Sequence, residues 1–111
     1  MAETYKNARA AVGTTYATVY TCPSGTTAIV LAAQAANVDG GMNSADVSAQ
    51  WLDNSAADVA TRLVEAISVA AKSSDMLTGG PIILEAGDAF QAKASAAGDI
   101  ELTLTILEIT P

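Results

Sequence analysis

Apolar and polar residues alternate with a period of two along most of the chain, which is the spacing of β-strands. The alternation is clearest over residues 45–53, where Val47, Ala49 and Trp51 point to one side and polar residues to the other. Residues 16–22 are rich in β-branched and aromatic side chains, which favours a strand. Residues 26–38 are apolar on both faces, which is typical of a strand covered on both sides.

Turn residues separate these segments at short intervals. Gly or Pro stands in most breaks, as in Pro23-Ser24-Gly25 and Gly79-Gly80-Pro81, and Asp53-Asn54-Ser55 ends the strand over 45–53. Short strands are expected between the later breaks, at 82–85, 89–95 and 100–109. The count is seven to eight strands, which predicts an all-β chain folded as a single antiparallel β-sandwich of the jelly-roll or Ig-like kind.

Residues 56–74 fit two patterns. Val59, Leu63 and Ile67 recur at helical spacing, and Ser55 with Asp58 resembles a capping box. The same stretch also alternates like a strand. Propensity alone favours a helix here, so a short helix within 56–74 stands as the alternative to a strand over 62–69.

The last strand changes phase near its end. Ile100, Leu102, Leu104 and Ile106 share one face, but Leu107 and Ile109 fall on the other. Either a bulge shifts the alternation, or this end of the strand is covered on both sides.

Residues 1–15 are polar and mixed, and we expect an N-terminal arm with a first short strand there. The β-sandwich domain is expected over 16–111. A chain of 111 residues has no room for a second domain.

The composition limits the classes of function that the chain can have. Half of the residues are apolar but only 5% are aromatic, so the core is thin in large side chains and oligomer contacts are expected to supply burial. The net charge of −7 offers no positive field for nucleic acid. The chain has no histidine and one cysteine, Cys22, which rules out a Ser-His-Asp triad and an intrachain disulfide.

Catalytic and metal-binding patterns are weak. Glu85 and Asp88 flank a turn, as do Asp99 and Glu101, and turn acids are ordinary. A loop with Asp39, Asn43 and Asp46 fails the spacing of an EF-hand. We therefore expect no catalytic residue, no cofactor and no metal, and we expect a binding or structural protein rather than an enzyme.

Six residues are candidates for contacts with partners. Trp51 by default packs in the core, but tryptophan is also an interface anchor. Tyr5 lies in the polar N-terminal segment with the only two neighbouring bases, and two methionines lie in expected loops. The candidate interface residues are Tyr5, Lys6, Arg9, Trp51, Met42 and Met76.

The N-terminus lacks the apolar region of a signal peptide, and the longest apolar run, 28–33, is too short to cross a membrane. We therefore expect a soluble protein made in the cytoplasm, with no membrane partner.

Three stretches together resemble a family, the small β-sandwich virion proteins of tailed bacteriophages. The pattern is a Y-x-x-P-x-G-T-x-A hairpin with a following A-N, an alternating strand, and an L-E-A-G-D turn before two final strands. It is carried by residues 20–31 (YTCPSGTTAIVL), 36–37, 45–51 (ADVSAQW) and 80–88 (GPIILEAGD), and by 95–99 and 106–109. The family has a strand before the Gly-Gly-Pro break, often with a proline-containing loop, where this chain has Ala70-Ala71-Lys72.

The resemblance implies a capsid decoration, or cement, protein on the virion surface. It also implies an oligomer, with a trimer favoured, that binds the major capsid protein or other virion proteins through residues 1–12 and loops 38–45 and 71–80. Such a protein is made in the host cytoplasm. A tail, neck or fibre-associated virion protein of the same fold is the second possibility, and a small carbohydrate- or calcium-binding β-sandwich is the third.

Overall fold

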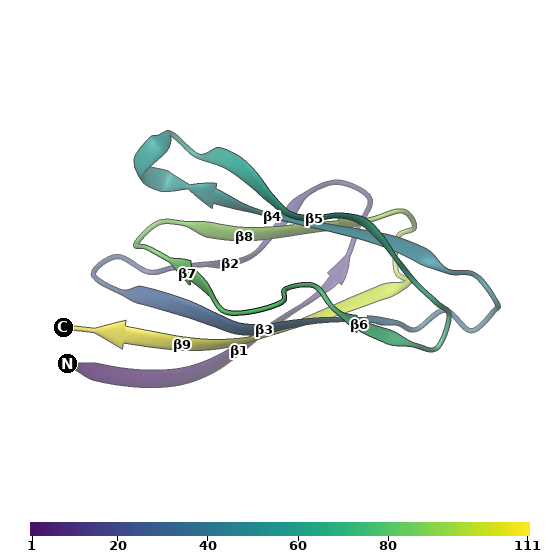
Figure 1. Ribbon diagram of the computed structural model, residues 1–111, viewed down its shortest axis with the longest axis horizontal. Helices are drawn as coiled ribbons and strands as arrows, with labels where there is room; N and C mark the ends of the chain where they lie inside the picture. The colour runs from purple at the N-terminus through teal and green to yellow at the C-terminus, as the bar shows by residue number, and fades with distance from the viewer.

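Antiparallel strands account for most of the chain in the computed structural model, which describes residues 1–111 (Figure 1). The only helical segment is a short 3-10 turn, η1 (Asn54–Ala56). The strands are β1 (Ala2–Val12), β2 (Ala17–Thr21), β3 (Thr27–Asn37), β4 (Ala45–Asp53), β5 (Val59–Val69), β6 (Ser74–Met76), β7 (Ile82–Leu84), β8 (Ala89–Ala94) and β9 (Ile100–Thr110). The all-β prediction is confirmed, with nine strands instead of seven to eight.

The strands form two sheets that pack face to face. Sheet A has the order β1-β9-β3, and both β6 and β7 pair with the free side of β3. Sheet B has the order β2-β8-β4-β5. In Figure 1 the strands of sheet B lie toward the upper side of the view, and β9 and β1 lie along its lower margin.

The pairing of the strands identifies a jelly roll. Because β6 and β7 pair with successive parts of β3, they act as one interrupted strand, and the chain then has eight. The first strand pairs with the last, β2 with β8, β3 with the interrupted strand, and β4 with β5. This is a ribbon of four antiparallel pairs rolled into two sheets. In an Ig-like sandwich consecutive strands share a sheet from the start, whereas here β1 and β2 lie in different sheets.

The core lies between the sheets, and β9 contributes four of its large side chains. Ile100, Leu102, Leu104 and Ile106 are all fully buried there, opposite Phe90 of β8. Seven of the 19 residues in the core cluster are alanines. Each large aliphatic side chain stabilises the fold by about 2 kcal/mol on burial, and an alanine by much less. The core is therefore thin, as the composition indicates.

Residues 59–69 form β5 and pair with β4, so the strand considered over 62–69 is confirmed and the alternative of a helix within 56–74 is wrong. The register shifts twice along this pair, and Ala66 has a positive φ of 51°. This irregularity turns Leu63, Val64 and Ile67 toward the core together. A bulged strand thus reproduces the apolar spacing of a helix.

The ends of the chain also differ in detail from the sequence pattern. The expected short first strand runs from Ala2 to Val12 and pairs with β9 at every position. Its polar side chains do not prevent this, because strand pairing needs only the backbone. The alternation of β9 continues to its end without a bulge, so Leu107 and Ile109 face outward on sheet A.

Candidate interaction surface

The outer face of sheet B carries a ladder of polar side chains that satisfy one another. Gln91 Nε2 donates to Thr18 Oγ1 at 3.2 Å, and Gln50 Nε2 donates to Gln91 Oε1 at 2.7 Å. Arg62 Nε donates to Gln50 Oε1 at 3.3 Å. Tyr16 lies beside this ladder, with the Arg62 guanidinium 5.3 Å from its ring. A face built this way is suited to water.

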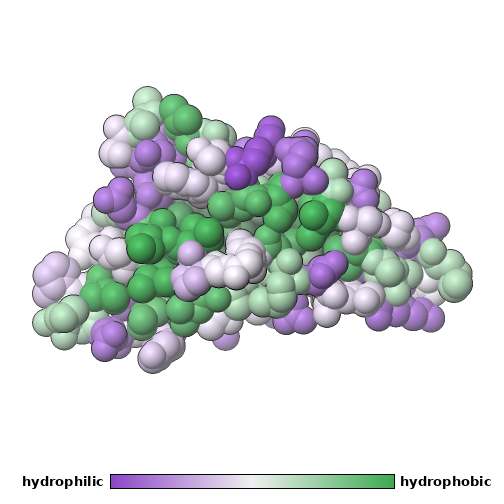
Figure 2. Space-filling view, viewed as in Figure 1, coloured by the Kyte–Doolittle hydropathy of each residue, from purple (hydrophilic) through white to green (hydrophobic).

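The outer face of sheet A is different, because an apolar row crosses four of its strands. Ile83 of β7 is opposite Ile29 of β3, Ile29 is opposite Leu107 of β9, and Leu107 is opposite Tyr5 of β1. We call Tyr5, Ile29, Ile83 and Leu107 the apolar row. Tyr5 is 74% exposed and Ile83 62% exposed. In Figure 2 hydrophobic residues form a band over the region where Figure 1 places β7, β3 and β9.

Tyr5 and Ile83, at the two ends of the apolar row, are exposed, and Ile29 and Leu107 between them are partly buried. Leu31, exposed where the register of β3 and β9 shifts, and Ile109 next to Leu107 add to the apolar face. Contiguous exposed apolar surface on a small domain marks an interaction site. We therefore identify the outer face of sheet A as the candidate interaction surface.

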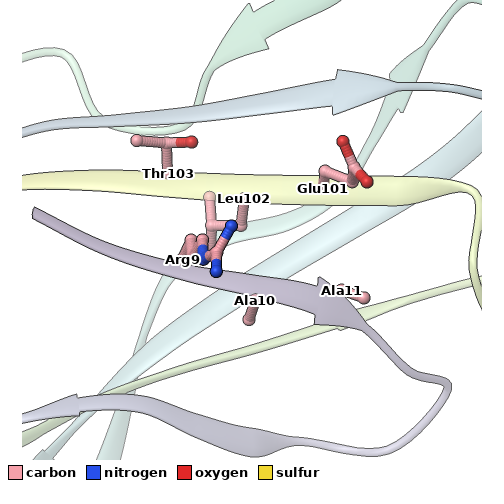
Figure 3. A pocket seen from close by; sticks show the side chains of 6 residues that line it. All are labelled: Arg9, Ala10, Ala11, Glu101, Leu102 and Thr103. Carbon is pink, nitrogen blue, oxygen red and sulfur yellow. The ribbon is translucent and has the colours of Figure 1, made fainter.

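The edge of sheet A at β1 is open along its length. β1 has a partner on one side only, and its eleven pairs with β9 contain no bulge and no proline. Such an edge presents free backbone donors and acceptors to another strand. Glu3 and Arg9 both point to the outer face, and neither forms an ion pair within the chain. Figure 3 shows a shallow hollow beside Arg9, lined by Ala10 and Ala11 of β1 and by residues of β9.

A buried carboxylate ties β1 to the rest of the sandwich. Glu108 on the inner face of β9 is 8% exposed and accepts a hydrogen bond from the Tyr20 hydroxyl of β2 at 2.5 Å. Lys6 Nζ of β1 lies 3.2 Å from the other carboxylate oxygen. The Tyr20 hydrogen bond, more than the Lys6 ammonium, lowers the pKa of Glu108. Burial and the same hydrogen bond raise the pKa of Tyr20.

The structure places the candidate interface residues in different parts of the fold. Tyr5 and Arg9 lie on the outer face of β1, with Lys6 between them on the inner face, and Met76 lies on β6 of the same sheet, opposite the outward-facing Gln34. Met42 is elsewhere, exposed in the loop between β3 and β4. Trp51 packs against the core from β4 of sheet B.

The residues that sequence reasoning missed are Ile29, Ile83 and Leu107. The signal for Leu107 was present in the phase change after Ile106. For Ile29 it was present in the apolar character of both faces of residues 26–38.

The side chains of Asp88, Asp39 and Cys22 contact backbone groups of the fold itself. Asp88 is buried, and its two carboxylate oxygens accept from the backbone N–H groups of Asn54 and Glu85, both at 2.9 Å. Asp39 accepts from Gly41 N within its own turn. No three His, Cys, Asp or Glu side chains gather as metal ligands would.

Cys22 is buried, and burial raises the pKa of its thiol. No helix has the length and apolar character needed to span a membrane.

Comparison with solved structures supports the fold assignment. No protein-family model matches the chain, and no curated protein matches it. This chain is similar to a chain in the acidic stable capsid of Helicobacter pylori bacteriophage KHP30, with a TM-score of 0.58 and 14% identity. The match covers 100% of this chain and 90% of the capsid chain. It is also similar to a chain from the disulfide-linked pili of Bacillus endospore appendages, with a TM-score of 0.56 and 18% identity. That match covers 98% of this chain and 87% of the pilus chain.

A third match is to the infectious bursal disease virus, Gx strain. The match covers 96% of this chain but only 30% of the viral chain, with a TM-score of 0.51 and 10% identity. At these identities the likeness establishes a shared fold, which occurs in a phage capsid, a bacterial pilus and a birnavirus.

Proposed function

We propose that this chain is a bacteriophage virion structural protein, a decoration protein that lies on the capsid and stabilises it. The observation that carries the proposal is a jelly roll whose two outer faces differ, with the apolar row on sheet A and the polar ladder on sheet B. An apolar sheet face suits contact with a protein lattice, and the polar ladder of sheet B suits the solvent side. The end-to-end match to a chain of a phage capsid supports this role.

The single cysteine favours a capsid over a disulfide-linked pilus. Cys22 is 1% exposed, and its sulfur lies 3.3 Å from the backbone oxygen of Thr26. A thiol in that position does not reach a cysteine of a neighbouring molecule without local unfolding. A pilus held together by disulfides therefore does not suit this chain.

The proposed contact with the shell is broad and non-covalent. The apolar row lies at its centre, and residues 1–12 and the loops 38–45 and 71–80, with Met42 and Met76, extend it. The proposed partner is the major capsid protein. Many copies on a symmetric lattice gain by avidity, so each contact can be weak. Stabilisation of this kind needs no catalytic residue. Self-association is part of this proposal, and the native mass distinguishes the trimer that the family resemblance implies from other assemblies.

The test is to locate the chain in the particle. Virions of the phage that encodes it are separated into heads and tails, and the chain is quantified against the major capsid protein by mass spectrometry. The proposal predicts copies on heads in a fixed ratio to the capsid protein, and heads that break at lower temperature when the gene is deleted. Recovery with tails or necks would support the alternative of a tail, neck or fibre-associated protein, and absence from the particle would refute both.

A further inference from the structure

The free edge of β1 has a charge pattern that is complementary to itself. Glu3 and Arg9 lie on the same outward face of one strand, six residues apart, and neither has an ionic partner in the chain. Lys6 lies midway between them, on the inner face. When two such strands run antiparallel around a centre at Lys6, each Glu3 falls opposite Arg9 of the other copy.

We propose that two copies of this chain pair through their β1 edges, antiparallel, with the twofold axis at Lys6. The two sheets A then form one continuous sheet across the pair. Directly opposite side chains in antiparallel strands lie about 5 Å apart at Cβ, within reach of an ion pair. The pairing satisfies both unpartnered charges twice, and it pairs the free backbone groups of both edges.

This register also joins the two apolar rows. Tyr5 faces Asn7 of the second copy, and the two Tyr5 rings become diagonal neighbours, about 7 Å apart at Cα, within reach of aromatic side chains. The apolar row of one copy (Ile83, Ile29, Leu107, Tyr5) then continues into that of the other. The pair presents a single apolar band that crosses both molecules.

The meeting of Lys6 with Lys6 of the second copy does not oppose the pairing. Each ammonium lies 3.2 Å from the Glu108 carboxylate of its own chain, which offsets its charge. Moving the axis to Asn7 would place Glu3 opposite Ala11, and its carboxylate would stay unpaired. The axis at Lys6 is therefore the register that uses both free charges.

Charge reversal tests the pairing without touching the core. The variants Glu3→Arg and Arg9→Glu each place like charges opposite one another at two symmetric positions. Each is expected to raise the dissociation constant of the dimer about tenfold, measured by sedimentation across a concentration series. The double variant E3R/R9E restores opposite charges, and its dissociation constant is expected to return to within about threefold of the wild type. Asp75→Arg, on exposed β6 at the other edge of sheet A, is the control and should change nothing.

Crosslinking tests the register. In the variant Lys6→Cys the two new thiols lie at the axis and should oxidise to a dimer, since paired Cβ atoms there are near disulfide distance. In the variant Ala8→Cys, on the same face, the thiols are offset by four residues and should stay reduced. Cys22 is buried and does not interfere.

A chain that stays monomeric at every concentration would overturn the proposal. So would crosslinking of Ala8→Cys but not Lys6→Cys, or a trimer whose stability the β1 variants leave unchanged. The last result would favour the assembly that the family resemblance implies. Binding to heads is measured separately, so the pairing can fail while the proposed function holds.

Discussion

Replacing the buried carboxylate of Glu108 by an amide, in the variant Glu108→Gln, should destabilise the fold and loosen β1. The carboxylate accepts from the Tyr20 hydroxyl at 2.5 Å and lies 3.2 Å from Lys6 Nζ. A charge-assisted hydrogen bond is worth about 1 kcal/mol more than a neutral one. The half-exposed ion pair with Lys6 adds about 0.5 kcal/mol. The expected loss is therefore between about 1 and 2 kcal/mol.

The loss should depend on pH in a defined way. The pKa of Glu108 is lowered in the folded chain, so its charge stabilises the fold above the ordinary carboxyl pKa of about 4.3. That contribution disappears as the pH falls through the lower pKa of the folded state. The difference between wild type and Glu108→Gln should therefore be full at pH 7 and should shrink on acidification below about pH 4.

Urea unfolding followed by the fluorescence of Trp51, the only tryptophan, measures both effects. A loss of 1 kcal/mol lowers the melting temperature by about 4 °C in a chain of this size. Hydrogen exchange should show the largest gain in amide exchange along β1. Glu101→Gln, on the exposed face of the same strand, is the matched control and should stay within about 0.5 kcal/mol of the wild type. A Glu108→Gln protein as stable as the wild type at pH 7 would show that the carboxylate charge does not stabilise the fold.

Three other changes have definite expected results. Gly87→Ala should lower the free energy of unfolding in urea by about 2 kcal/mol, because φ at this position is +86° and the new Cβ would lie 2.5 Å from Asn54 Nδ2. Adding Asn54→Ala should relieve the clash but leave the backbone strain. Cys22 should react with a thiol reagent only as fast as the protein unfolds, and prompt labelling of the native protein would contradict its burial. Leu107→Ser should leave the pairing through β1 unchanged and the melting temperature within about 2 °C of the wild type, because Leu107 lies on β9, one strand in from the β1 edge; a large fall in melting temperature would show that the apolar row supports the fold itself.

The fold class followed from the sequence because alternation and turn residues are local signals. The strands around Val47 and Ile100 are set by side chains two residues apart, and breaks such as Pro23-Ser24-Gly25 need no distant partner. The jelly-roll order did not follow, because it depends on which distant strands pair. The helical spacing of Leu63 and Ile67 led to a helix being considered for this stretch. The same spacing arises from a bulge between β4 and β5, and that bulge depends on the pairing of the two strands.

The candidate surface followed only in part for the same reason. Tyr5, Lys6 and Arg9 stand out in a polar segment and are close in sequence. The apolar row joins four strands, from Tyr5 to Leu107, Ile29 and Ile83, and only the register brings these residues side by side. The phase change at Leu107 predicted either a bulge or a strand end covered on both sides, whereas the structure shows an unshifted strand with Leu107 and Ile109 on the outer face of sheet A.

Reconstitution on heads shows whether sheet A is the face that meets the capsid. Purified chain is added to heads from a phage that lacks its gene, and bound copies are counted after gradient sedimentation. We expect saturable binding that raises the temperature at which heads break. Leu107→Ser on sheet A should lose this binding, and Gln91→Ala on the polar face of sheet B should keep it. Equal binding by both variants, or loss with Gln91→Ala alone, would contradict the assignment of sheet A as the face that meets the capsid.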